Sequence, residues 1–122
     1  MADGVLLAES LRVGASLDRV PLMVEKVSRA NAGDESVGQP RTWTYIHFAL
    51  ADEDAEALAE ALSEALNAVG GWYCDFRTAE ETFVVFAGRV FRYQRGREDG
   101  REQAQTYALS VGVPQTQLDW PE

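Results

Sequence analysis

The sequence predicts an α+β protein with a mostly antiparallel five-stranded sheet and two helices packed on one face of that sheet. The segment from Trp72 to Tyr93 holds three aromatic-rich stretches separated by two short turns, as in a β-meander. Asp52 to Val69 and Gly100 to Val111 each place apolar side chains at helical spacing. With two strands before the first helix, the expected order along the chain is ββαβββα.

Length and composition favour a single folded unit. The chain has 122 residues, of which 46% are hydrophobic and 25% are charged, a balance typical of globular domains. It contains neither an internal repeat nor a low-complexity tract. We therefore expect residues 1–122 to form one α+β domain. Residues 1–19 fit either a helical turn or a strand, and Gly14 interrupts both patterns.

Two strands are expected in the first half of the chain. Val20 to Arg29 alternates in polarity, and Pro21 places its start at a sheet edge or a strand terminus. Ala30 to Arg41 is rich in Gly, Ser, Asp, Asn and Pro, which predicts a loop. Thr42 to Leu50 is the second strand, and one of its faces carries Trp43, Tyr45 and His47.

The first helix is expected from Asp52 to Val69. Its apolar stripe consists of Ala55, Leu58, Ala59, Leu62, Ala65, Leu66 and Val69. Asp52 is a suitable N-cap, and the glycine pair Gly70 and Gly71 can supply the left-handed conformation found at helix ends.

The second half of the chain predicts three strands, a helix and a tail. The strands are Trp72–Arg77, Thr82–Ala87 and Val90–Gln94, with Gly88 in a tight hairpin between the last two. The helix from Gly100 to Val111 ends at Gly112 and Pro114. Leu118 and Trp120 are apolar, so we expect the tail that carries them to pack back on the body.

The arrangement leaves the face of the sheet opposite the helices without a cover. That face is expected to carry Trp43, Tyr45, Tyr73 and either Phe83 or Tyr93, which are too apolar to leave in water. We expect the cover to be the N-terminal segment, a partner chain or a ligand, in that order of preference. The first two are preferred almost equally.

Charge argues against polyanionic partners. The net charge of −9 disfavours binding to nucleic acid and to anionic membranes. The charge is also segregated, with acids concentrated between Asp52 and Glu64 and five arginines between Arg89 and Arg101. This separation suggests a homodimer guided by opposite charges.

The chain offers no set of residues for a metal or a cofactor. Cys74 is the only cysteine and His47 the only histidine, so neither an intramolecular disulfide nor a cysteine cluster can form. Neighbouring apolar residues favour a core position for Cys74. The N-terminal stretch has acid where a signal peptide needs basic residues and has only a short apolar run, which predicts a cytoplasmic protein without a membrane segment.

Two segments of the second half, GWYCDFRTAEETFVVFAGRVFRY and SVGVPQTQLDW, carry a resemblance. They resemble the C-terminal half of a family of small bacterial proteins of actinobacterial type. Ten arginines against one lysine agree with the GC-rich genomes of such organisms. The family has no assigned activity, so the resemblance implies no functional residue.

Candidate site residues gather around His47. A nearby carboxylate would let it act as a general base, and Asp75 is a possible partner, although a packed histidine is the simpler interpretation. Arginines bind anions bidentately, which adds a possible phosphate or carboxylate ligand. The candidates for ligand binding are Tyr45, His47, Asp75, Arg77 and Arg92, and those for a protein interface are Trp43 and Tyr73.

Three functional classes remain open. The leading hypothesis is a non-catalytic interaction module that self-associates or binds a protein partner through its aromatic sheet face. The alternative is a protein or enzyme that binds an anionic small molecule in a pocket near His47. The third is an acidic mimic of nucleic acid, which the arginine-rich segment disfavours. No nucleophile elbow, phosphate-binding glycine loop or metal-binding motif is present in the sequence.

Overall fold

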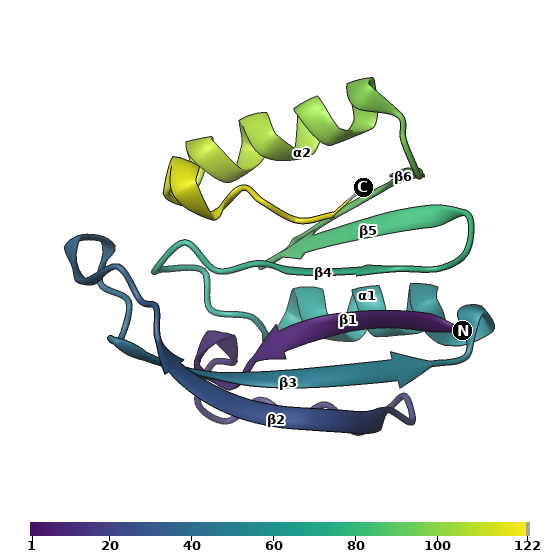
Figure 1. Ribbon diagram of the computed structural model, residues 1–122, viewed down its shortest axis with the longest axis horizontal. Coiled ribbons are helices and arrows are strands. Elements are labelled where there is room, and N and C mark those ends of the chain that lie inside the picture. The colour runs from purple at the N-terminus through teal and green to yellow at the C-terminus, as the bar shows by residue number, and fades with distance from the viewer. Residues whose placement is uncertain (122) are drawn as a thin grey trace.

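A six-stranded antiparallel sheet forms the centre of the molecule, in the strand order β2-β3-β1-β4-β5-β6. The computed structural model describes residues 1–121 (Figure 1). Its helices are α1 (Ala55–Ala65) and α2 (Glu98–Ser110). Its strands are β1 (Ala2–Leu7), β2 (Met23–Asn31), β3 (Thr42–Leu50), β4 (Cys74–Arg77), β5 (Glu81–Phe86) and β6 (Arg89–Gln94).

The α+β class, the antiparallel sheet and the two helices are confirmed, but the strand count and order are wrong. The N-terminal segment forms a sixth strand, β1, so the order along the chain is βββαβββα. This strand lies between β3 and β4, where Ala2 and Leu6 are buried on one face. Val5, Leu6 and Leu7 are consecutive apolar residues, so the strand lacks a clear alternation of polar and apolar side chains, which is why the sequence pattern did not reveal it.

The two helices cover opposite faces of the sheet, not one face as expected (Figure 1). Helix α1 packs in a cluster with Phe76 and Phe83, whereas α2 packs in a second cluster with Val84 and Phe86. Because Phe83 and Val84 are consecutive in β5, they point to opposite sides of the sheet. Amphipathic spacing shows that a helix has one apolar face, but it does not show which side of the sheet that face meets.

Helix α1 is shorter at both ends than the sequence predicts. Residues Asp52–Asp54 form a 3-10 turn, and no side-chain hydrogen bond caps that turn or α1, so the expected cap at Asp52 is wrong. The helix ends at Ala65 because Leu66 adopts extended geometry and bridges to Leu11. Val69 is therefore outside the stripe and 84% exposed. A tertiary contact ends this helix before the glycine pair.

The C-terminal tail packs back on the body, as expected. Trp120 is 2% exposed, and its Nε1 donates a 2.9 Å hydrogen bond to Oη of Tyr93. The tail runs between α2 and the β4–β5 region (Figure 1). It therefore covers part of the sheet face on which α2 lies, which is called the reverse face below.

The face covered by α1 holds the larger core. The rings of Phe76 and Phe83 stack with centroids 4.9 Å apart, and Phe48 packs edge-on to Phe76. Cys74 is 2% exposed in the same cluster, so its expected burial is confirmed. Within residues 1–121, neither α-helix is long and apolar enough to cross a membrane.

Candidate ligand-binding site

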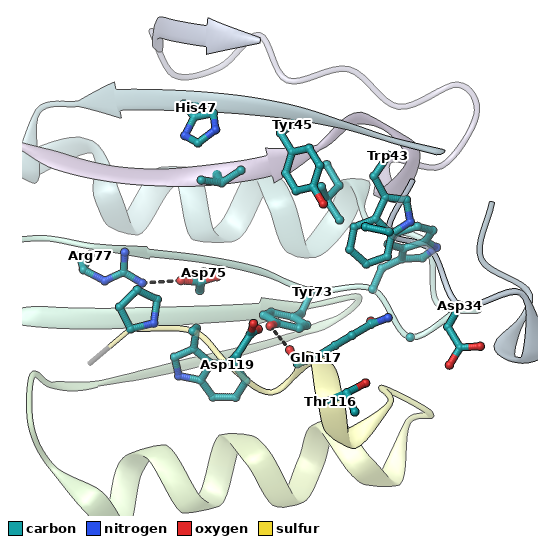
Figure 2. Close-up of a pocket in the computed structure, with 17 residues that line it drawn as sticks. Asp34, Trp43, Tyr45, His47, Tyr73, Asp75, Arg77, Thr116, Gln117 and Asp119 are labelled. Atoms are coloured by element: carbon teal, nitrogen blue, oxygen red, sulfur yellow. Dashed lines mark hydrogen bonds and ion pairs between the residues drawn. The ribbon is translucent and has the colours of Figure 1, made fainter. Parts of the chain in front are cut away.

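The reverse face has one packed half and one hollow half. Helix α2 covers β5 and β6, whereas the face formed by β3, β1 and β4 borders a cavity of about 660 Å³. The C-terminal tail forms the opposite wall of this cavity, as Figure 2 shows. The volume falls within the range of about 300–1,000 Å³ that is common for small-molecule sites.

The floor of the cavity is the reverse side of β1. Val5 and Leu7 line it, and both are partly buried. In the sheet register, Val5 pairs with His47 on β3 and with Asp75 on β4. These two side chains therefore flank an apolar floor, and their backbones are separated by two strand spacings, or about 10 Å.

Aromatic rings line the cavity from two sides. On the β3 side, the ring of Trp43 lies 6.3 Å from that of Tyr45 and 5.6 Å from that of Trp72, measured between centroids. On the tail side, Tyr73 and Trp120 pack edge to face with centroids 5.2 Å apart. All three tryptophans of the chain line this one cavity. Their fluorescence and indole N–H signals are consequently direct reporters of its occupancy.

Polar contacts hold the tail above the sheet. The Tyr73 hydroxyl donates to the backbone carbonyl of Gln117 (Figure 2). The side-chain amides of Gln117 and Gln39 bond reciprocally, at 2.9 and 3.1 Å. Gln39 is 3% exposed and also donates to the carbonyl of Gly70. One end of the cavity is thus closed by a link between the tail and the loop after β2.

An ion pair occupies the other end. Arg77 donates to the Asp75 carboxylate, and the two side chains are 12% and 19% exposed. Burial raises the pKa of Asp75 above its ordinary value of 3.8, and the opposing effect of Arg77 does not cancel the rise. Burial likewise raises the pKa of the Tyr73 hydroxyl. Asp119 on the tail lines the cavity near this end (Figure 2), and its negative charge adds to both shifts.

The structure brings together most of the residues proposed from the sequence. Tyr45, His47, Asp75 and Arg77 all line the cavity. The residues proposed for a protein interface, Trp43 and Tyr73, line it too.

Arg92 lies elsewhere, on the face of the sheet that α1 covers. It forms two hydrogen bonds with Glu81, at 2.7 and 2.9 Å, and an ion pair with Glu56 of α1 at 3.5 Å. Its guanidinium also lies over the ring of Phe83, 5.0 Å from the centroid. Arg92 is therefore separated from the other candidates by the sheet.

Sequence reasoning missed both the floor and the tail wall. Val5 and Leu7 belong to the strand that was not recognised, and Gln117 and Asp119 to a tail expected only to pack on the body. Trp120 was expected to anchor the tail but not to line a site. Neither had a local signal in the sequence, because Val5 and Leu7 lie in a run without alternation and the partners of the tail are far away in the chain.

The charged side chains of the cavity are few, and two of them are paired with each other. No hydrogen bond joins His47 to a carboxylate in the part of the chain that the structure describes, and Asp75 is already paired with Arg77. Among residues 1–121, no group of three or more His, Cys, Asp or Glu side chains lies together in a way that could hold a metal ion. The site offers a recessed apolar space with a few charges at its ends.

The arginine-rich segment is largely engaged within the chain. Arg92 pairs with the acidic helix α1, and Arg97 pairs with Asp99 at 3.1 Å. Arg89 lies over the rings of Phe91 and Tyr107, 4.8 and 5.2 Å from their centroids. The ion pairs of Arg92 and Arg97 leave less uncompensated positive charge on this segment to guide a second copy.

Comparisons with protein-family models, with curated proteins and with solved structures found no match. The resemblance to a family of small bacterial proteins of actinobacterial type therefore stays a prediction.

Proposed function

We propose that this chain is a cytoplasmic, non-catalytic binding protein whose ligand is a small organic molecule held between the sheet and the C-terminal tail. The observation that carries the proposal is the cavity of about 660 Å³ on the reverse face, lined by all three tryptophans. Large apolar walls with a few polar groups at defined places are typical of sites that hold small molecules. The single cysteine, buried as a free thiol, fits a reducing compartment.

Binding is favoured over catalysis because the site lacks an activated group. A general base needs a partner that orients it, and His47 stands across β1 from Asp75, about two strand spacings (~10 Å) away. The carboxylate of Asp75 is held by Arg77. A ligand lying on Val5 would contact His47 on one side and Asp75 on the other. Binding such a ligand does not require proton transfer between these two residues.

A small molecule is favoured over a protein partner on this face. Trp43 is 9% exposed, and the hydroxyl of Tyr73 is bonded beneath the tail. A flat protein surface cannot reach rings that lie at the bottom of a recess. The aromatic face therefore supports a pocket better than the association surface that the sequence suggested first.

The proposal is tested by placing larger side chains on the β1 side of the cavity and measuring the binding of a dye. The probe is N-phenyl-1-naphthylamine, a neutral dye whose emission rises in apolar surroundings. Val5→Trp and Leu7→Trp each add a large ring in the recess, and Val13→Trp is a matched control because Val13 is 101% exposed on a loop. We expect saturable binding at one dye per chain for the native protein and for Val13→Trp, and loss of binding in both floor variants. Native-like circular dichroism and melting temperature would show that each variant is folded.

Equal dye binding by the native protein and a folded floor variant would overturn the proposal. So would a native protein that does not bind the dye saturably.

Self-association is a second candidate, supported by the edge strand β2. Met23, Val24 and Val27 on this strand are 56%, 56% and 59% exposed, and apolar edges are prone to pairing. A register irregularity between Val24 and Lys26 opposes such pairing, which is why this candidate ranks second. Sedimentation velocity over a range of protein concentrations tests it, with Val27→Lys as the disrupting variant. A single monomer species at every concentration would rule it out.

A further inference from the structure

The charges around the cavity point to a particular class of ligand. Three carboxylates line it, from Asp34, Asp75 and Asp119, against the one guanidinium of Arg77. With all four groups ionised and His47 neutral, the lining has an excess of two negative charges. Arg77 is moreover occupied by Asp75, so little positive charge is left for an anion.

The rings of the cavity provide a second and independent attraction for positive charge. Each aromatic face has negative electrostatic potential, and a cation within about 6 Å of a ring centroid is stabilised by it. Tyr45 and Trp43 approach the recess from β3, and Tyr73 approaches it from the opposite side, as Figure 2 shows. A cation on the floor at Val5 would therefore face rings from both sides.

One carboxylate at the tail end is placed to act as a counter-ion. Asp119 lies on the tail and lines the cavity together with Tyr73 and Asp75, as Figure 2 shows. Asp119 is exposed, so water weakens its attraction for a cation, and the carboxylate adds to the attraction of the rings. An anionic ligand would meet the opposite field, and a neutral ligand would gain only apolar contacts.

We infer that the ligand of this cavity is a small organic cation, whose quaternary or protonated amine lies between Tyr45 and Tyr73 with Asp119 as its counter-ion. This inference rests on the proposed binding function and specifies its ligand class. It replaces the anionic ligand suggested by the arginines of the sequence, because Arg92 lies on the other face and Arg77 is paired.

The experiment compares two molecules of the same shape. Choline and 3,3-dimethylbutan-1-ol differ in that a carbon atom replaces the charged nitrogen. Both are titrated into ¹⁵N-labelled protein at constant ionic strength, with the three indole N–H signals as reporters of the cavity. We expect choline to bind about tenfold more tightly than the neutral isostere. Acetate, as a small anion, should shift none of the three signals.

Two variants identify the source of the preference. Asp119→Asn removes a proposed counter-ion, and Asp18→Asn makes the same chemical change at an exposed position outside the cavity. We expect the choline-to-isostere ratio to fall about threefold or more in Asp119→Asn and to be retained in Asp18→Asn. Tyr45→Leu keeps an apolar side chain but removes the ring, and it should lower the ratio as well.

Equal affinity for choline and its isostere, or binding of neither, would overturn the cation inference. A ratio that is the same in Asp119→Asn, Tyr45→Leu and the native protein would overturn it also. The dye titration above decides separately whether the cavity binds ligands at all. Saturable dye binding together with no preference for choline would leave the proposed function in place and remove only the ligand class.

Discussion

Both halves of the reverse face carry apolar side chains, but these side chains are buried in one half and border a cavity in the other. Over β5, Val84 and Phe86 are 0% and 2% exposed, packed beneath α2. Over β1 and β3, Val5, Leu7 and Tyr45 are only partly buried and border the cavity. Apolar side chains lie on the sheet in both places, but the hollow half also carries His47, Asp75 and Arg77, and a different segment lies over each half.

Helix α2 and the tail cover the sheet in different ways. The helix presents Ala104 and Ala108, both 0% exposed, and such small side chains let it approach β5 closely. The tail is anchored by the indole of Trp120 and by the amide pair of Gln117, and the residues at and between these anchors line the cavity instead of filling it. The same apolar face thus becomes core beneath the helix and a site beneath the tail.

The sharpest test of this contrast exchanges a core ring and a cavity ring for alanine. Phe86→Ala removes a ring that is 2% exposed beneath α2, where it packs against Phe91 and Tyr107, and should cost about 3–5 kcal/mol in free energy of unfolding. Tyr45→Ala removes a ring that borders empty space and should cost about 1 kcal/mol. Urea denaturation measures both. Similar losses for the two variants would mean that the cavity half is packed like the core.

The next largest effect concerns the anchor of the tail. Trp120→Ala removes the edge-to-face contact with Tyr73 and the hydrogen bond to Tyr93, at an expected cost of about 3 kcal/mol. Without its anchor the tail should leave the sheet, and saturable dye binding should be lost. Trp120→Phe keeps a ring and serves as the milder control. Full dye binding in Trp120→Ala would show that the tail is not a wall of the site.

A smaller effect is the pH dependence that Asp75 gives to stability. Because its pKa is raised in the folded state, mainly by burial, the folded protein holds this proton more tightly than the unfolded chain. The contribution of Asp75 to the free energy of unfolding is therefore greatest below pH 3.8, the ordinary pKa of the group. It falls as the pH rises through the raised pKa. Asp75→Asn should lack this fall, and Asp18→Asn should retain it, in urea denaturation series between acidic and neutral pH. Parallel curves for the native protein and Asp75→Asn would contradict the raised pKa.

The smallest effect is expected at the one proposed site residue that lies outside the cavity. Arg92→Gln breaks the pairing with Glu81 and Glu56, but the arginine side chain is 45% exposed and its ion pairs are screened by water. The expected loss is about 0.5 kcal/mol, with no change in dye affinity. A clear loss of dye binding in this variant would connect the two faces of the sheet and weaken the contrast drawn above.

Local pattern in the sequence was enough for most elements. Alternation located β3 at Thr42–Leu50, and helical spacing located both helices, although Leu66 and Val69 were included in α1 incorrectly. The hairpin glycine Gly88 has φ of 73°, which fits the turn expected between the last two strands. Such features depend on a few neighbouring residues, and that is the range over which a sequence pattern is informative.

The candidate site was foreseen in part, for the same reason. Tyr45 and His47 share one face of a strand, and Asp75 and Arg77 share one face of another, so alternation alone grouped each pair. That the two pairs face one cavity depends on β1 lying between their strands. Arg92 was assigned to the same site because its neighbours in the chain gave no indication of which face of the sheet it would occupy.

The sequence by itself determined the α+β class, the strand and helix segments of the second half, and an aromatic sheet face in need of a cover. Only the tertiary structure decided that the N-terminal segment enters the sheet as β1, that the helices lie on opposite faces, and that the tail roofs a cavity. The physical reason is the range of the interactions involved. Backbone propensity and side-chain alternation act between near neighbours, whereas strand order and the choice of sheet face follow from packing between residues far apart in the chain.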